Sequence, residues 1–279
     1  MIRSVLLLTL LLSACVRVPF ERADAMSAIP IEKLGEDRLA LHWKFITADH
    51  IVDVSPQEFA SALISGDTLY IGSASGMFYS LRASTGKLRW KANLGPVVSA
   101  PIVIGTTLYV GNKEGFLKAV DSQTGRVKWK YASRGAIEQS PVATGDLIVF
   151  ANEADQVVAL DATTGKYKWQ FKSETPEEYT LRGHAGLAVD GELLFTGFSN
   201  GTLVALRRDT GSVAWSTSLK AEAERFMDVD ATPIVLGDRV YASSSSGGVF
   251  SLDKATGLVR WRLPFYDAAQ PSSSAPWWK

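Results

Sequence analysis

The sequence predicts an all-β fold built from five copies of one module, and two regularities carry that prediction. Each copy ends on the motif Thr-Gly-x-x-x-Trp, and 28 residues always separate the first residue of the module from its Trp. Ten residues before the motif Gly stands another Gly in four copies and Asp155 in the third copy. Repetition this regular indicates that each module is one supersecondary unit that packs against the next. The modules span residues 62–90, 101–129, 141–169, 187–215 and 233–261.

Within a module the residues favour four short strands. In the second module we expect strands at 102–104, 108–110, 116–120 and 126–129, separated by turns rich in Gly, Asn, Asp and Thr. Four antiparallel strands per module, repeated radially, are typical of a β-propeller blade. A stacked β-solenoid is the alternative, but it would have shorter repeats. The sequence therefore predicts a propeller with five complete four-stranded blades.

The turns and the Trp of each module have predicted structural roles. The repeated Gly positions are expected at positive φ, which Asp155 tolerates better than most residues. Four residues before the motif Gly, Asp121, Asp161 and Asp253 can accept hydrogen bonds from main-chain amides across the turn, whereas arginine takes that place in the other two copies. The Trp is expected to pack between neighbouring blades, because a single blade cannot bury both faces of its sheet.

The N-terminal residues differ in kind from the modules. Arg3 and the apolar run 5–12 are typical of a signal peptide, and Leu12-Ser13-Ala14-Cys15 resembles a bacterial lipobox. Cys15 is the only Cys of the chain. We therefore expect a lipoprotein signal peptide at 1–14, a lipid on Cys15, and a polar tether at 15–38. An ordinary signal peptide with an incidental Cys is the alternative.

The propeller domain is expected to occupy residues 39–279. Residues 41–45 resemble the last strand of a module with nothing before it, an orphan N-terminal strand. Ser274-Ala275-Pro276 repeats the module opening Ser99-Ala100-Pro101, which predicts a partial sixth blade at the other end. Whether the chain is a fragment or a natural early stop, and whether the ring closes, stay open at this point.

Composition excludes several classes of function. The formal net charge is zero and the basic residues form no cluster, so no nucleic-acid partner is expected. The three histidines are scattered without the spacing of metal ligands. No Ser/His/Asp order or Gly-rich phosphate loop is present. We expect no enzyme activity, no catalytic residue, no metal and no cofactor.

Variation between the modules is confined to the links that join them. The spacings from each Trp to the next module are 11, 12, 18 and 18 residues, so the two long links are consecutive and are expected to lie side by side. Loops of a rigid scaffold often carry function. The long links contain the candidate partner-binding residues Leu181, Arg182, Asp228 and Asp230. A mixture of apolar residues, arginine and carboxylates is typical of an interface. The alternative is that Arg182 pairs with one of the two aspartates.

These motifs together resemble one family. Residues 159–169 show the PQQ-like repeat pattern Ala-x-Asp-x-x-Thr-Gly-x-x-x-Trp. With the lipobox, the sequence Leu181-Arg182-Gly183 and the segment 228–233, the chain resembles the BamB family of the outer-membrane β-barrel assembly machinery from Cys15 to Trp261. The resemblance implies a non-catalytic lipoprotein, anchored in the outer membrane and facing the periplasm. It implies docking of these two loops on the POTRA domains of BamA within the Bam complex, with nascent β-barrel strands as further candidate clients. Tyr179 departs from the aliphatic residue that the family favours.

Two other classes share the repeat. PQQ-dependent dehydrogenases resemble a larger propeller with a Ca²⁺ site and usually a vicinal Cys pair, whereas this chain has a single Cys. A generic periplasmic propeller lipoprotein that scaffolds another complex would have the same fold and anchor. It would differ only in not depending on Arg182 or the two aspartates.

Overall fold

The computed structural model describes residues 41–47, 60–174, 185–220 and 228–264. The chain divides into two compact units, Met1–Lys44 and Phe45–Lys279, and the second unit contains every sheet. The described residues form five four-stranded antiparallel sheets and no helix, so none of them can cross a membrane as a helix.

The first sheet is β1(Leu63–Ser65), β2(Thr68–Gly72), β3(Met77–Arg82) and β4(Leu88–Asn93). The second is β5(Ile102–Ile104), β6(Thr107–Gly111), β7(Phe116–Asp121) and β8(Val127–Ala132). The third is β9(Val142–Thr144), β10(Leu147–Asn152), β11(Gln156–Asp161) and β12(Tyr167–Lys172). The fourth is β13(Ala188–Asp190), β14(Leu193–Gly197), β15(Thr202–Arg207) and β16(Val213–Ser218). The fifth is β17(Ile234–Leu236), β18(Arg239–Ser244), β19(Gly248–Asp253) and β20(Val259–Leu263).

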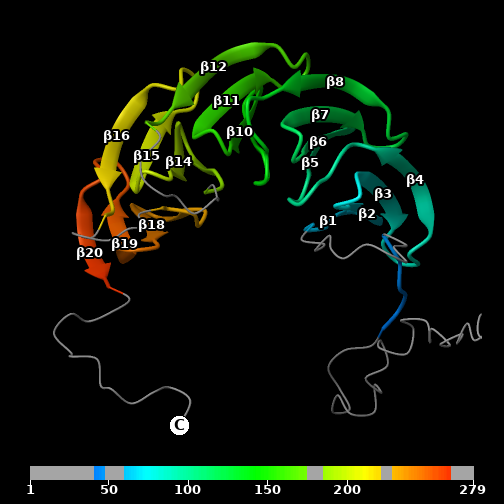
Figure 1. The fold of residues 1–279 in the computed structure, drawn as a ribbon, viewed down its shortest axis with the longest axis horizontal. Coiled ribbons are helices and arrows are strands. Elements are labelled where there is room, and N and C mark those ends of the chain that lie inside the picture. The colour runs from blue at the N-terminus through cyan, green and yellow to red at the C-terminus, as the bar shows by residue number, and fades with distance from the viewer. Residues whose placement is uncertain (1–40, 48–59, 175–184, 221–227, 265–279) are drawn as a thin grey trace, which may run out of the picture. The chain divides into compact units, whose positions relative to one another are not determined.

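Each sheet is one sequence module, and its strands pair in chain order. The sheets lie side by side in chain order, with the fourth strand of each on the outer side (Figure 1). The predicted β-propeller blades are therefore confirmed. Residues 41–45, expected as an orphan strand, form no strand in the structure, because a strand needs a ladder partner and none of the five described sheets pairs with them. The partial sixth blade was predicted at residues that lie outside the described ranges.

A β-bulge recurs at one place in every blade. The register between the third and fourth strands shifts after a small residue, for example between Ala159 and Leu160. The shift sets the motif Trp directly opposite that small residue, as in the pair Ala159 and Trp169. The other four blades pair Ser80, Ala119, Ala205 and Ser251 with their Trp in the same way. A bulge re-aims the side chains of its strand, and here the large indole lies over a residue small enough to accommodate it.

Each of the first four Trp side chains packs against the next blade, as the sequence predicts, and in addition donates a hydrogen bond to it. The indole Nε1 atoms of Trp90, Trp129, Trp169 and Trp215 donate to the carbonyl oxygens of Ser122, Ala162, Arg208 and Lys254, at 2.9, 3.1, 2.8 and 2.9 Å. Each acceptor lies three residues before the motif Gly of the next blade. The polar end of a buried Trp requires such a partner, so one side chain joins apolar packing to a directional bond between blades.

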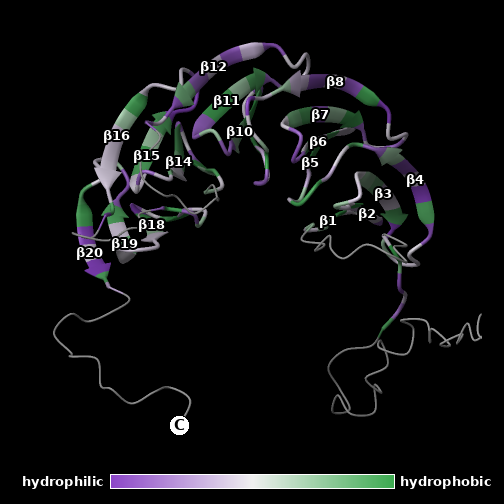
Figure 2. Ribbon diagram, in the orientation of Figure 1, coloured by the Kyte–Doolittle hydropathy of each residue, from purple (hydrophilic) through white to green (hydrophobic). Residues whose placement is uncertain are grey.

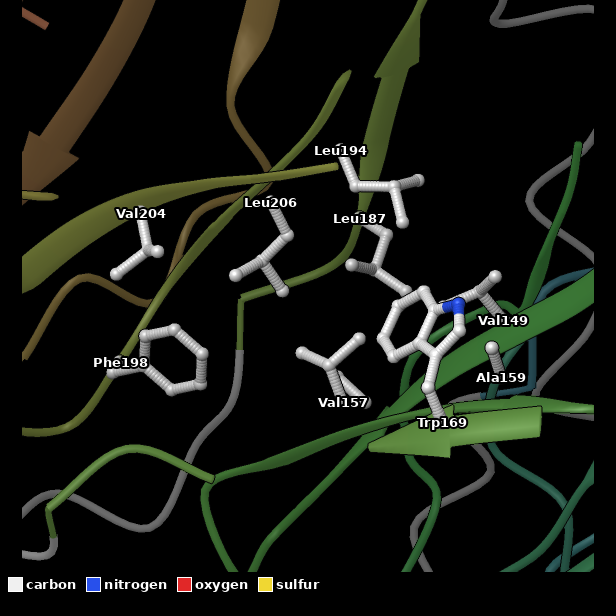
Figure 3. Close-up of a cluster of buried hydrophobic side chains, with 10 residues drawn as sticks. Val149, Val157, Ala159, Trp169, Leu187, Leu194, Phe198, Val204 and Leu206 are labelled. Carbon is white, nitrogen blue, oxygen red and sulfur yellow. The ribbon is translucent and has the colours of Figure 1, made fainter. Parts of the chain in front are cut away.

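Four apolar clusters fill the contacts between consecutive blades. Trp169 is 7% exposed and belongs to the cluster between the third and fourth blades. Figure 3 shows its indole beside Val149 and Leu187. The other clusters join the first blade to the second, the second to the third and the fourth to the fifth. The core is thus divided among the blade contacts.

The Trp of the fifth blade is the exception among the five. Trp261 is 43% exposed, and Leu263 beside it is 63% exposed. Its ring contacts Tyr241 of its own blade, with centroids 6.0 Å apart. The same sequence position is therefore buried or exposed according to whether a neighbouring blade covers it.

The outer strands carry polar and apolar residues in alternation, visible in Figure 2 along β4, β8 and β12. The fourth strand of a blade is the edge of its sheet, with one side unpaired in the described chain. Lysine and arginine on such an edge oppose strand-to-strand association between molecules. Arg89, Lys128 and Lys168 are examples.

The predicted turn caps are also present. The Asp161 Oδ1 atom accepts from the Thr164 N–H at 2.9 Å and from the Thr164 hydroxyl at 2.8 Å. These bonds lower the pKa of Asp161, with the hydroxyl bond as the largest cause. Asp121 and Asp253 make the same two bonds in their own turns. In the first blade, where arginine holds this position, Asp67 instead accepts from the Ser84 N–H at 3.0 Å.

We expect Gly211→Ala to be far more destabilising than Gly105→Ala, although both glycines have positive φ (70° and 56°). A Cβ on Gly211 would lie 2.4 Å from the Trp169 ring, whereas a Cβ on Gly105 meets nothing within 4 Å. Gly105→Ala should cost about 1–2 kcal/mol from backbone strain alone. Gly211→Ala should add about 1–3 kcal/mol of overpacking. Urea unfolding followed by circular dichroism measures both, and equal losses would show that the indole moves aside without cost.

Candidate functional site

The links between blades share one mode of attachment. In the first link the Val97 N–H donates to Ser73 O at 3.2 Å, and Pro96 O accepts from the Lys113 N–H of the next blade at 2.9 Å. In the second link Ile137 and Ala136 make the two equivalent bonds, at 3.0 Å each. A Cβ on Gly72 would lie 2.4 Å from Val97. In each short link an aliphatic side chain, Val97 or Ile137, therefore packs against a glycine of the preceding blade. The main chain of the link forms hydrogen bonds with both the preceding and the following blade.

The fourth link repeats this attachment with charged residues on either side of the aliphatic one. The Val229 N–H donates to Phe198 O at 3.2 Å, and Asp228 O accepts from the Ser245 N–H at 2.9 Å. Val229 is 0% exposed and lies against Gly197, where a Cβ would be 2.2 Å away. Both main-chain bonds and the valine hold the segment in place. The positions of Asp228 and Asp230 are consequently set by the blades.

The two long links meet at their described ends. A Cβ on Gly186, near the end of the third link, would lie 2.3 Å from the hydroxyl oxygen of Thr232 in the fourth link. The Thr196 hydroxyl of β14 lies 3.2 Å from Gly186 O and 3.3 Å from Ala185 O. This contact agrees with the expectation that the two long links lie side by side.

The two aspartates have different environments. Asp228 is 0% exposed, whereas Asp230 is partly exposed. The Oδ1 atom of Asp230 is buried and has no hydrogen-bond partner in the described part of the chain. Burial, and secondly the charge of Asp228, raises the pKa of Asp230 to about 6. Ionisation of Asp230 therefore lowers the stability of the isolated protein. Residues with strongly shifted pKa values cluster at functional sites.

The other predicted site residues have no structural account. Leu181, Arg182 and Cys15 lie outside the described residues, so the structure brings together only Asp228 and Asp230 of the partner-binding set. Among the residues that are described, no group of three or more His, Cys, Asp or Glu could hold a metal ion.

The sequence contains one further regularity that the sequence analysis missed, the alignment of the links on the module that follows each of them. Arg182 and Asp228 each stand five residues before the start of a module, at 187 and 233. Pro96 and Ala136 hold the same position in the short links. Alignment of the links on the following module would have shown that the two long links have residues of opposite charge, Arg182 and Asp228, at one equivalent position. In the fourth link the main chain at this position is hydrogen-bonded to the next blade.

The blades, their Trp contacts and their Thr-Gly turns define a class of protein, the β-propellers of PQQ-like repeats. A family profile described as outer membrane protein assembly factor BamB matches residues 40–110 and 103–276. The chain belongs to this family. No individual curated protein sequence matches it.

Solved structures agree on the fold. BamB from Moraxella catarrhalis superposes with a TM-score of 0.66 and 22% sequence identity, over 76% of this chain and 66% of that one. The chain thus spans just under two thirds of that relative. The quinohemoprotein alcohol dehydrogenase ADHIIG from Pseudomonas putida HK5 gives a TM-score of 0.61 and 20% identity, over 74% of this chain and 42% of the other. The enzyme from Comamonas testosteroni gives 0.60 and 17%, over 74% and 43%. Identities this low establish the blade architecture and leave function to the residues of the site.

Proposed function

We propose that this chain is a non-catalytic lipoprotein scaffold of outer-membrane β-barrel assembly, which docks through its two long links on the POTRA domains of BamA. Cys15 is the proposed lipid anchor, and the propeller faces the periplasm. Membership of the BamB family supports the assembly role. The proposed contacts are Leu181 and Arg182 in the third link with Asp228 and Asp230 in the fourth.

One observation carries the proposal: the Asp230 carboxylate has a buried oxygen without a partner among the described residues, on a segment that main-chain bonds attach to two blades. A buried acceptor left unbonded costs free energy, and a donor from another protein would recover it. A preorganised segment also loses little conformational entropy on binding. Because the Asp228 side chain is buried, we assign the direct contact to Asp230 and a supporting charge to Asp228.

Charge reversal at Arg182 tests the docking. Arg182→Glu should abolish recovery of BamA from outer-membrane extract on the immobilised chain, while the β-rich circular dichroism spectrum is unchanged. Arg134→Glu, at an exposed arginine of the second link, is the matched control and should leave recovery intact. Equal recovery by wild type and Arg182→Glu would keep the partner and reject the site. Failure of the wild type to recover BamA would reject the assembly role in favour of another scaffold function.

The anchor is tested separately. Cys15→Ala should move the protein from the membrane fraction to the soluble periplasmic fraction, because a thioether-linked lipid is lost and the described residues contain no helix that could span a membrane. Cell fractionation followed by immunoblotting measures the distribution. A Cys15→Ala protein that stayed entirely with membranes would show that something other than this lipid attaches it.

A further inference from the structure

The outer strands of the first three blades bring together basic residues that form no cluster along the chain. Each of the segments 86–93, 125–132 and 165–172 contains three lysine or arginine residues and no carboxylate. The strands of these segments, β4, β8 and β12, follow one another on the outer side of three consecutive blades (Figure 1). We call their basic residues the basic rim, and all nine are exposed: Lys87, Arg89, Lys91, Arg126, Lys128, Lys130, Lys166, Lys168 and Lys172.

Carboxylates neutralise only part of the basic rim. Arg89, Lys128 and Lys168 pair with aspartates of neighbouring turns at 3.4, 3.8 and 3.4 Å. The other six residues form no ion pair with any residue that the structure describes. The rim therefore keeps a net positive charge on its exposed surface.

This charge is most concentrated on the second blade. Lys130 of the rim lies directly opposite Lys118 in the ladder between β7 and β8. Their ammonium nitrogens lie 5.6 and 5.7 Å from the centre of the same Phe116 ring. Like charges directly opposite each other destabilise a pair of strands. A bound anion would relieve this repulsion.

Protection of sheet edges does not account for the basic rim. β16 is the outer strand of the fourth blade and the edge of its sheet, yet the segment 211–218 contains no charged residue. If lysine and arginine served only to oppose association between edges, the fourth blade would need them too. The outer strand of the fifth blade has Arg260 and Arg262, and Arg260 pairs with Asp253. The concentration of charge on three consecutive blades therefore indicates a binding surface.

Apolar side chains lie between the basic residues of the rim. Leu88, Val127 and Tyr167 are 48, 47 and 52% exposed, and each stands next to two of the rim residues in the sequence. Lysine and arginine beside exposed apolar and aromatic side chains are typical of protein surfaces that lie at a lipid interface. This composition favours an anionic membrane over an acidic protein as the partner.

We propose that the basic rim binds an anionic phospholipid surface and so orients the propeller on the membrane. The inference rests on one part of the proposed function, the lipid on Cys15, which would hold the propeller close to a membrane. Each lysine or arginine near an anionic membrane strengthens the attraction, and a basic patch is a common second attachment beside a lipid anchor. The rim belongs to the first three blades, whereas Asp230 follows the fourth, so the two binding surfaces are separate.

Vesicle binding by the full mature chain with Cys15→Ala tests the rim without the lipid. We expect binding to vesicles of phosphatidylglycerol and phosphatidylcholine, no binding to pure phosphatidylcholine, and loss of binding in about 1 M salt, where charges are screened within about 3 Å. Adding Lys91→Glu, Lys130→Glu and Lys172→Glu together, one on each blade, should weaken binding about a hundredfold or more. Vesicle cosedimentation measures the partition, and circular dichroism checks that the β-rich fold is kept.

A second triple variant is the matched control. Arg134→Glu, Arg207→Glu and Lys220→Glu change the net charge by the same amount at exposed residues outside the rim. Binding to the anionic vesicles should stay within about threefold of the unsubstituted rim. Equal loss in both triple variants would show that net charge alone drives binding and would overturn the assignment to the rim.

The remaining outcomes separate this inference from the proposed function. Equal binding to neutral and anionic vesicles, or no binding to either, overturns the inference, and the second result leaves an acidic protein as the partner to test. Recovery of BamA is measured on the same variants, and the rim variant should recover it as well as the unsubstituted chain does. Failure to recover BamA would reject the docking function, whereas selective vesicle binding would still support the rim.

Discussion

Replacing Trp169 by Ala is expected to lower the free energy of unfolding by about 3–5 kcal/mol, the range for truncation of a buried aromatic side chain. Trp169 is 7% exposed, lies in the cluster between the third and fourth blades, and donates to Arg208 O. Its loss leaves a cavity between two blades and an unbonded carbonyl. For a domain of this size the melting temperature should fall by roughly 10 °C or more.

Trp261→Ala is the matched control, because it changes the same position of the same module. Trp261 is 43% exposed and has no cluster from a following blade in the described chain. We expect a loss of about 1–2 kcal/mol, mainly from its contact with Tyr241. Thermal unfolding by circular dichroism compares the two. If both variants lost the same stability, the Trp would act within its own blade, contrary to the role assigned to it here.

Asp230→Asn is expected to stabilise the isolated protein and to weaken its binding to the partner. The folded-state pKa of Asp230, about 6, lies above the usual aspartate value of 3.8. A raised carboxyl pKa means that the folded state favours the protonated form, so the stability that this group contributes is present below pH 4 and is lost as the pH rises through 6. The neutral amide removes that loss.

The difference between Asp230→Asn and wild type should therefore depend on pH. Near pH 4 the two proteins should melt at similar temperatures, and above pH 6 the variant should be more stable by about 1 kcal/mol, or roughly 3 °C. This is well below the full linkage value, because Asp230 is partly exposed and solvent screens its charge. Asp238→Asn, at a carboxylate of the fifth blade whose side chain is 86% exposed, should show no such dependence.

Binding should change in the opposite direction. A hydrogen bond from a partner to an ionised Asp230 is worth about 1.5–3 kcal/mol, so loss of the charge should weaken affinity for the proposed partner, the POTRA domains, about tenfold or more at pH 7.5. Titration calorimetry of both variants measures this. A variant that was more stable and bound as tightly as wild type would show that the raised pKa has no part in docking.

Much of the fold could be predicted from residue order because its interactions are local. The Thr-Gly turns, the four strands of each module and the caps at Asp121, Asp161 and Asp253 all depend on residues a few positions apart. The expected strand at 41–45 was wrong for the opposite reason. A lone strand depends on an unoccupied ladder edge elsewhere in the chain, which its own residues do not reveal.

The candidate site could be located but not described. Spacing between modules pointed to the two long links, and charge pointed to Asp228 and Asp230. The two aspartates differ in burial because Val229 packs against Gly197, which places the neighbouring Asp228 in the contact between two blades. Sequence spacing does not reveal that packing.

The sequence by itself determined the five complete blades, the order of their strands and the turn that closes each one, because each module repeats a complete set of local preferences. It did not determine the strand limits: the last strand of the second module was expected at 126–129 and is Val127–Ala132. Only the tertiary structure decided how packing between blades changes the burial, the pKa and the hydrogen bonding of particular residues. It buried Trp169 and left Trp261 exposed, raised the pKa of Asp230, and bonded Asp155 to Ser199 in the next blade. Burial, desolvation and bonds between blades arise only when one sheet packs on another, and an identical position in an identical module meets a different neighbour each time.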